Sequence, residues 1–209
     1  MQEMLNKISE LKIVPVVKLD RASDAANLAH ALIAGGLPVA EVTFRTDAAE
    51  ESIRIMSQIP GMLVGAGTIT SIEQAERAIA AGAQFFVTPG FSRKITEFAL
   101  SKNMPIFPGV CTPSEIMSII EYGLPVAKFF PAEQYGGVAT IKALLGPFPN
   151  MKFMPTGGVS TKNILEYLAV KQIVACGGSW MVKDTLINEG KFDEITKMTR
   201  EAVELVNGK

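Results

Sequence analysis

The sequence predicts an α/β fold, a parallel eight-stranded (β/α)8 TIM barrel with an N-terminal helix. Two observations lead to this prediction: short apolar runs rich in β-branched residues alternate with helical patterns, and the cycle occurs eight times, about every 26 residues. The runs span residues 13–18, 39–44, 62–67, 84–88, 105–109, 126–130, 152–156 and 173–178. Because alternation does not prove that the sheet closes, an open doubly wound sheet is the structural alternative.

The predicted helices have recognisable first and last residues. Side chains that can bind the free amides of a first turn occur in three capping-box patterns, Asp47-x-x-Glu50, Ser71-x-x-Gln74 and Thr112-x-x-Glu115. Pro113 follows Thr112 at the first helical position, where proline is favoured. Glycines that can end a helix occur at 35–36, 82 and 123.

An amphipathic segment precedes the first strand. Met4, Leu5, Ile8 and Leu11 form an apolar stripe at helical spacing, so we expect this helix to pack against the barrel and cap its bottom. No linker, low-complexity stretch or shift in composition divides the chain. Residues 1–209 are therefore expected to form a single (β/α)8 barrel domain.

The composition excludes several classes of function. The chain is 48% hydrophobic and 20% charged, as in well-cored globular proteins. Its formal charge is −1 and it has no lysine or arginine block, so we expect no nucleic-acid partner. The longest uncharged stretch, residues 55–72, contains Pro60 and several glycines, so we expect no membrane span.

Few residues are available for metal binding or nucleophilic catalysis. His30 is the single histidine and is expected at the surface; Cys111 and Cys176 lie far apart, so no metal and no cofactor are expected. Two lone thiols and a charged N-terminal segment unlike a signal peptide suggest a cytoplasmic location. Carboxylates and lysines are the reactive groups that remain.

A carboxylate lies within the second predicted strand. Strand alternation places Glu41, Thr43 and Arg45 on one face of VAEVTFRT. A buried carboxylate is costly unless it is paired or used, so Glu41 is either a general base beside a cation or half of a structural ion pair with Arg45.

Lys128 lies within the apolar sixth run, where a simple core would have an aliphatic residue. Apolar surroundings favour the neutral amine, which can attack a ketone to form a Schiff base. The structural alternative is a lysine that extends to solvent at the end of the strand. We expect at least two of the neighbouring aromatics Phe129 and Phe130 and the later Trp180 to pack in the core.

Glycine-rich turns follow three strands. The turn at 65–68 brings Thr68 to the end of the third strand, and the turns at 155–158 and 176–179 follow the seventh and eighth strands. Barrels commonly bind phosphate at these last two loops through backbone amides. Tight turn geometry alone is the other explanation.

Together these segments resemble the 2-keto-3-deoxy-6-phosphogluconate (KDPG) and 4-hydroxy-2-oxoglutarate (KHG) aldolase family over nearly the full chain. The motifs that carry the resemblance are EVTFRT (41–46), VGAGTI (64–69), TPG (88–90), PGV (108–110), KFFPAE (128–133), PTGGVS (155–160) and GGSW (177–180). The resemblance implies a class I, metal-free aldolase that forms a homotrimer.

The resemblance also implies roles for individual residues. Lys128 matches the Schiff-base lysine, and Glu41 matches the proton acceptor and donor, which works through a bound water. The positions that match substrate-binding residues are Arg45 and Thr68 for the pyruvate carboxylate, Thr156 in the pocket wall, and Gly157, Gly158, Gly178 and Ser179 at the phosphate end. Lys18 is given no role.

The implied reaction cleaves KDPG, a phosphorylated 2-keto-3-deoxy sugar acid, to pyruvate and glyceraldehyde 3-phosphate, with KHG as a further substrate. Preference for the galactonate stereoisomer is the nearest alternative, because pocket shape decides it. A barrel that binds sugar phosphates without catalysis, or that isomerises or epimerises them, is the alternative from another class.

Overall fold

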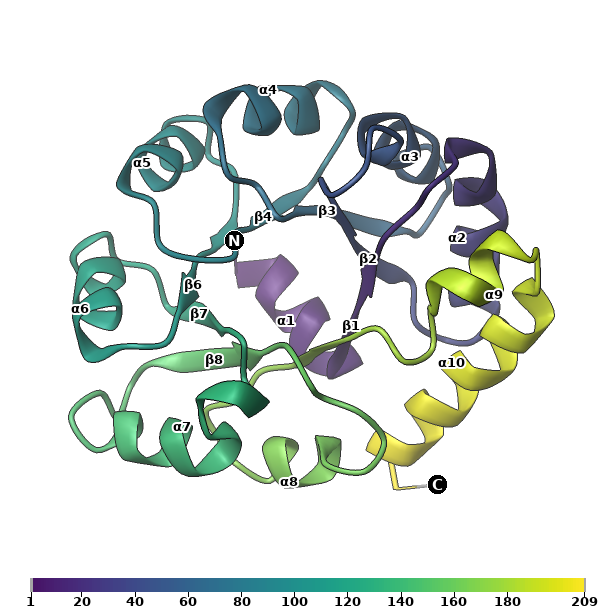
Figure 1. The fold of residues 1–209 in the computed structure, drawn as a ribbon. Helices are drawn as coiled ribbons and strands as arrows, with labels where there is room; N and C mark the ends of the chain where they lie inside the picture. The colour runs from purple at the N-terminus through teal and green to yellow at the C-terminus, as the bar shows by residue number, and fades with distance from the viewer. Residues whose placement is uncertain (1, 209) are drawn as a thin grey trace.

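The computed structural model describes residues 2–208, and its strands form a ring inside a ring of helices (Figure 1). All the strand pairings are parallel, as short apolar runs joined by helices require. The strands are β1 Ile13–Val17, β2 Val39–Thr43, β3 Leu63–Gly67, β4 Phe85–Val87, β5 Ile106–Phe107, β6 Gly109–Val110, β7 Val126–Phe129, β8 Lys152–Pro155 and β9 Cys176–Gly178.

Two hydrogen-bonded arcs make up the wall, β5-β4-β3-β2-β1-β9 and β6-β7-β8. Isolated parallel bridges, Phe153 to Ile173 and Thr156 to Gly177, join β8 to the segment that contains β9. At the other boundary between the arcs, β5 and β6 follow each other in the chain and only Pro108 separates them. The predicted TIM barrel is therefore confirmed, and the open doubly wound sheet is wrong.

Proline explains why the predicted fifth strand, residues 105–109, is divided in two. Pro108 has no amide hydrogen to donate to a ladder, so the pairing with β4 ends at Phe107. Its carbonyl still accepts a hydrogen bond of 2.9 Å from the amide of Lys128, so the wall continues into β7.

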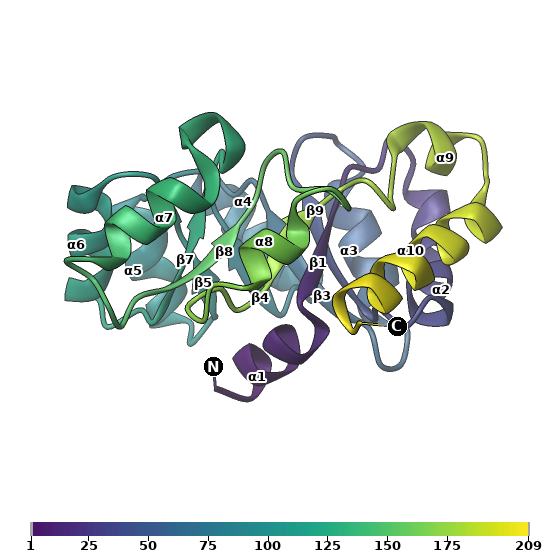
Figure 2. The same cartoon turned by 90° about the horizontal axis from the view of Figure 1, so that it is seen from below.

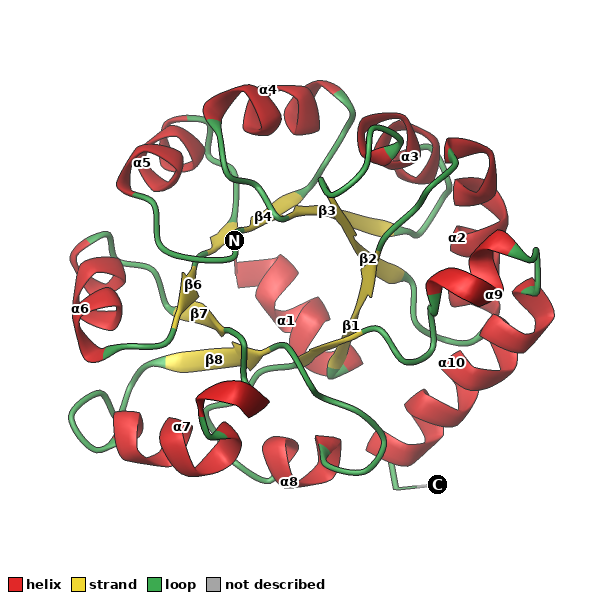
Figure 3. Ribbon diagram, viewed as in Figure 1, coloured by secondary structure: helices red, strands yellow, loops and turns green. Residues whose placement is uncertain are grey.

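Helices surround the strands, as the red outer ring of Figure 3 shows. They are α2 Ala25–Ala34, α3 Ala49–Ser57, α4 Ile72–Ala80, α5 Arg93–Ser101, α6 Pro113–Glu121, α7 Gly137–Leu145, α8 Ile164–Leu168, α9 Asp184–Asn188 and α10 Phe192–Val206, with short 3-10 turns at Ala22–Asp24 and Glu133–Tyr135. The last helix packs against α2, where the Thr196 hydroxyl donates to the Ala31 carbonyl at 3.3 Å. The helix ring closes there.

The N-terminal helix α1 (Gln2–Leu11) lies beneath the barrel (Figure 2). Its stripe supplies Leu5 and Ile8 to the buried core, and Met4 and Leu11 pack against that core while partly exposed. The helix ends immediately before β1, so it covers the amino-terminal end of the strands. This confirms the predicted bottom cap.

Two of the three predicted helix caps form. Ser71 and Thr112 accept hydrogen bonds from the amides of Gln74 and Glu115, and Thr112 with Glu115 forms a complete capping box behind Pro113. The Gln74 side chain binds the Thr70 amide instead of the Ser71 amide. The predicted glycine stops are present, with positive φ at Gly36, Gly82 and Gly123.

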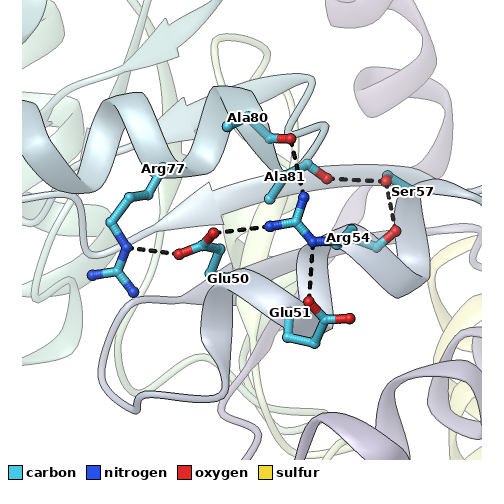
Figure 4. A network of polar contacts seen from close by, with 7 residues as sticks. All are labelled: Glu50, Glu51, Arg54, Ser57, Arg77, Ala80 and Ala81. Carbon is cyan, nitrogen blue, oxygen red and sulfur yellow. Dashed lines mark hydrogen bonds and ion pairs between the residues drawn. The ribbon is translucent and has the colours of Figure 1, made fainter.

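The Asp47 cap is wrong, because α3 begins after Ala48 and no side chain caps it. Glu50, the other half of the predicted box, is bound elsewhere (Figure 4). Its carboxylate binds Arg54 at 2.9 Å and Arg77 of α4 at 2.7 Å. Glu50 therefore ties α3 to α4 instead of closing a cap.

Among residues 2–208, no helix combines the length and the apolar composition needed to cross a membrane.

Candidate active site

Lys128 and Glu41 meet inside the barrel, although they are 87 residues apart in the sequence. Lys128 lies on β7 and Glu41 on β2, and the distance from Lys128 Nζ to Glu41 Oε1 is 3.2 Å. Lys128 is 4% exposed and Glu41 is fully buried. The lysine therefore does not extend to solvent, and the two predicted catalytic residues form a buried pair.

A glycine on the neighbouring strand makes room for the carboxylate. Gly67 ends β3, and a Cβ atom added there would lie 2.2 Å from Glu41 Oε1, far inside van der Waals contact. The other carboxylate oxygen, Oε2, is buried without a hydrogen-bond partner among the described residues. A buried carboxylate oxygen without a partner is unfavourable, so it is available to bind a water or a substrate proton.

Arg45 follows β2, but it does not pair with Glu41. Its Nε donates a hydrogen bond of 2.9 Å to the Thr43 hydroxyl, which in turn donates to the Val17 carbonyl at 2.8 Å. The structural alternative from the sequence, a Glu41–Arg45 ion pair, is therefore wrong. Arg45 is an exposed residue.

Thr68 lies at the end of β3, directly after the glycine that faces Glu41. Its φ of 57° is in the left-handed region, which is unfavourable for a β-branched residue. Strained backbone of this kind is concentrated at functional sites. Thr68 therefore directly follows the glycine that faces Glu41, and its role in binding substrate stays a prediction.

A cavity of about 200 Å³ opens at the carboxyl-terminal end of the barrel. Six of the predicted substrate-binding residues line it, namely Arg45, Thr156, Gly157, Gly158, Gly178 and Ser179. Val16, Phe130, Val159 and Gly177 complete the wall. Lys128, Glu41 and Thr68 do not line this cavity.

The glycine turn after β8 has a backbone conformation that requires glycine. Gly157 and Gly158 have φ of 101° and 78°, which only glycine adopts without strain. The segment after β7 supports this turn, because the amides of Ala132 and Glu133 donate to the carbonyls of Thr156 and Gly157 at 2.8 and 3.1 Å. The chain that carries Lys128 is thus bonded to the predicted phosphate loop.

The sequence interpretation missed Phe130 as a wall of the site. Its ring centroid is 5.0 Å from Lys128 Nζ, and Phe130 also lines the cavity, so this residue is next to both the amine and the cavity. Its neighbour Phe129 is fully buried and packs edge-on against Phe153. Phe130 directly follows the end of β7, and this position was the signal in the sequence that could have indicated a role at the site. Strand alternation does not predict the direction of a side chain beyond the end of the strand.

The remaining candidates for nucleophiles lie outside this site. Burial raises the pKa of the Cys176 thiol to about 12 and also raises the pKa of Cys111, where Glu115 adds to the effect. His30 is exposed on α2, as predicted. Within residues 2–208, no group of three or more histidines, cysteines or carboxylates is placed to hold a metal ion.

This arrangement suits carbonyl chemistry. An enclosed amine can attack a ketone, a carboxylate at 3.2 Å can move the protons, and a cation with glycine-loop amides can hold two anionic groups. Arg45 and the glycine loops line the cavity at the carboxyl-terminal end of the barrel, where barrel enzymes have their active sites, and Lys128 and Glu41 lie within strands β7 and β2.

Comparisons with known proteins agree with this chemistry. The family described as "Aldolase: KDPG and KHG aldolase" matches residues 4–198. The 2-dehydro-3-deoxy-phosphogluconate aldolase of Haemophilus influenzae is 47% identical over 206 residues, 98% of this chain and 97% of that protein. The KHG/KDPG aldolase of Escherichia coli K12 is 44% identical over 92% of this chain and 91% of its own.

Solved structures give the same result. The KDPG aldolase of Zymomonas mobilis ZM4, determined with 3-phosphoglycerate, superposes with a TM-score of 0.90 at 36% identity, covering 98% of this chain and 97% of its own. The KDPG aldolase of Legionella pneumophila, with pyruvate captured as a covalent carbinolamine intermediate, has a TM-score of 0.89 at 37% identity and covers 93% and 95%.

Proposed function

The chain belongs to the KDPG and KHG aldolase family, and we propose that it cleaves 2-keto-3-deoxy-6-phosphogluconate to pyruvate and glyceraldehyde 3-phosphate through a Schiff base on Lys128. The observation that carries the proposal is the buried Lys128–Glu41 pair at 3.2 Å. It supplies the nucleophile and the proton carrier of a class I aldolase. Neither a metal nor another cofactor takes part.

Lys128 begins the reaction as the nucleophile. Its neutral Nζ attacks C2 of the substrate, a C–N bond forms, and the ketone oxygen takes a proton to give a carbinolamine. Glu41, working through a bound water, donates the proton with which the C2 hydroxyl leaves as water. The product of this step is a protonated imine on Lys128.

The same carboxylate then acts as a base. Glu41 accepts the proton of the C4 hydroxyl, the C3–C4 bond breaks, and its electron pair moves into the imine to give an enamine. Glyceraldehyde 3-phosphate leaves. Protonation of the enamine at C3 and hydrolysis of the imine release pyruvate and restore the free lysine, so protons and electrons balance over the cycle.

The binding residues divide between the two ends of the substrate. Arg45 and Thr68 bind the carboxylate next to the ketone, and Thr156 forms part of the pocket wall. The amides of Gly157, Gly158 and Gly178, with Ser179, bind the phosphate. The 200 Å³ cavity that most of these residues line supports their role in binding substrate.

The proposal includes KHG as a second substrate, which would yield pyruvate and glyoxylate. The support is the family description and the relative from Escherichia coli, which is described as a KHG/KDPG aldolase. Both substrates share the 2-keto acid end that Lys128, Arg45 and Thr68 would hold. They differ at the phosphate end, so KHG should bind more weakly.

Measurement of pyruvate release tests the proposal. Steady-state rates with KDPG, KHG and the galactonate stereoisomer of KDPG should show the highest kcat/KM for KDPG. Equal or better turnover of the galactonate compound would contradict the stated substrate. A barrel that only binds sugar phosphates would release no pyruvate from any of them, and an isomerase or epimerase would convert substrate without releasing pyruvate.

A homotrimer and a cytoplasmic location complete the proposal. The family resemblance supports the trimer, and the two free cysteines are consistent with a reducing compartment. Sedimentation equilibrium should give about three times the 22.4 kDa mass of one chain. A species of the single-chain mass at micromolar concentration would contradict the trimer.

A further inference from the structure

Thr43 lies at the end of β2 between the backbone of β1 and the side chain of Arg45. It is 1% exposed. Its hydroxyl donates to the Val17 carbonyl at 2.8 Å and accepts a hydrogen bond from Arg45 Nε at 2.9 Å. A hydroxyl has a single hydrogen, and because Val17 takes it, a lone pair is left for Nε. The two bonds therefore support each other.

The bond to Nε limits how Arg45 can orient. The guanidinium is planar, so fixing Nε fixes the direction in which the terminal nitrogens extend. The four hydrogens on those nitrogens stay available as the fork that binds a carboxylate. Without this bond, an exposed arginine side chain would occupy many rotamers.

The support behind Thr43 is rigid. Val17 is fully buried, and its neighbour Val16 pairs with Glu41, so β1 contacts β2 beside the catalytic carboxylate. A second hydroxyl, that of Thr46, donates to the Leu19 carbonyl further along the same segment. The turn that carries Arg45 is thus bonded on one side of the arginine to Val17 at the end of β1, and on the other side to Leu19 in the segment that follows β1.

We propose that Thr43 is a positioning residue that sets the orientation of Arg45 toward the 2-keto acid carboxylate of the substrate. This inference rests on the proposed function, in which Arg45 binds that carboxylate. Thr43 does not line the cavity, so it acts through Arg45 and not by touching substrate. The hydroxyl group, and not the size of the side chain, is what the role requires.

The first test compares Thr43→Val with Thr43→Ser. Valine keeps the shape and removes the hydroxyl, so KM for KDPG should rise about tenfold, as expected for one lost hydrogen bond to a charged group. Because the carboxylate is bound before and during the chemical step, kcat should change by less than about threefold. Serine keeps the hydroxyl and should stay within about twofold of the wild-type KM. An unchanged KM in Thr43→Val, or an equal rise in Thr43→Ser, overturns the inference.

Thr46→Val is the matched control, since it removes the same hydroxyl from the same turn, where the partner is Leu19 and not Arg45. It should lower the melting temperature and leave KM within about twofold of wild type. A tenfold rise in KM for this variant would mean that anchoring of the turn, and not the bond to Nε, controls binding. That outcome overturns the inference.

A double-mutant cycle with Arg45→Ala provides the second test. If Thr43 acts through Arg45, adding Thr43→Val to Arg45→Ala should change KM by less than about twofold. An undiminished, multiplicative effect in the double variant overturns the inference. Failure of the proposed function is distinguishable, because wild-type protein would then release no pyruvate from KDPG, or would turn over the galactonate stereoisomer equally well or better.

Discussion

Glu41 and Lys128 illustrate what the sequence can predict about a single side chain. Strand alternation and an unexpected charge within an apolar run were enough to select both residues. The partner of Glu41 was not predictable from local pattern, since Arg45 was the nearer candidate. Only closure of the barrel brings β2 and β7 face to face, so that Glu41 pairs with Lys128 and not with Arg45.

The buried pair has a consequence for variants of Lys128. Replacing it with methionine, which has a similar length, should abolish turnover because no nucleophile remains. It should also lower the free energy of unfolding by about 3–5 kcal/mol, because Glu41 is left as a buried charge without a partner. Urea denaturation monitored by circular dichroism measures this loss.

Lys128→Met combined with Glu41→Gln is the matched control for that stability loss. The double variant removes both charges, so it should regain most of the stability while remaining inactive. If the single and double variants were equally unstable, the loss would come from packing and not from the unpaired carboxylate.

Glu41→Gln alone separates proton transfer from imine formation. The amide keeps the shape of the side chain but cannot accept a proton, so kcat should fall by about 100-fold to 10,000-fold. Lys128 is retained, so pyruvate should still form a slow imine that mass spectrometry detects after reduction. Near-normal kcat in this variant would show that another group moves the protons.

At the scale of elements, apolar periodicity located the strands well and capping patterns located only some helix starts. All eight predicted runs contain strand residues, and the division at Pro108 follows from the missing amide hydrogen of proline. The box at Asp47 fails because α3 begins after Ala48 and because Glu50 is engaged by Arg54 and Arg77. Such contacts between successive helices are not visible in a local motif.

Matched cap variants test this difference. Thr112→Ala should lower the free energy of unfolding by about 1 kcal/mol, because it removes the acceptor for the Glu115 amide. Asp47→Ala should change it by less than about 0.5 kcal/mol, as at an ordinary surface position. Comparable losses in the two variants would mean that Asp47 also caps its helix.

The Thr112 box should also depend on pH. Burial opposes ionisation of Glu115, but hydrogen bonds from the amides of Cys111 and Thr112 and from the Thr112 hydroxyl outweigh it and lower the pKa of the carboxyl. A carboxyl with a lowered pKa stabilises the fold above its unfolded pKa and loses that contribution as the pH falls through its folded value. The difference between wild type and Glu115→Gln should therefore shrink below about pH 4; an unchanged difference in denaturant titrations down to pH 3 would contradict the box.

At the scale of the whole molecule, the barrel converts scattered residues into one site. Its closure, which alternation predicted without proving, brings strands far apart in the sequence, such as β2, β3, β7 and β8, into one ring (Figure 1). The sequence could assign residues to strand ends, but the depth of the cavity depends on side-chain packing, as the wall formed by Phe130 shows. Side-chain packing of this kind is visible in the folded structure and could not be predicted from the sequence pattern.

The whole molecule should also work without a metal ion. Prolonged incubation with EDTA followed by gel filtration should leave the rate of pyruvate release within about 20% of the untreated value, since the proposed mechanism takes its nucleophile and its proton carrier from Lys128 and Glu41. A loss of activity that zinc or magnesium restores would contradict the class I mechanism.

The central claim is that Lys128 forms a covalent imine with the keto acid, and borohydride trapping tests it most directly. Wild-type protein incubated with pyruvate and sodium borohydride should gain the mass of one reduced pyruvate adduct, and peptide mapping should locate that adduct on Lys128. Protein treated without pyruvate, and Lys128→Met treated with it, should gain none. An active wild-type protein that shows no adduct, or an adduct on another lysine, would contradict the account.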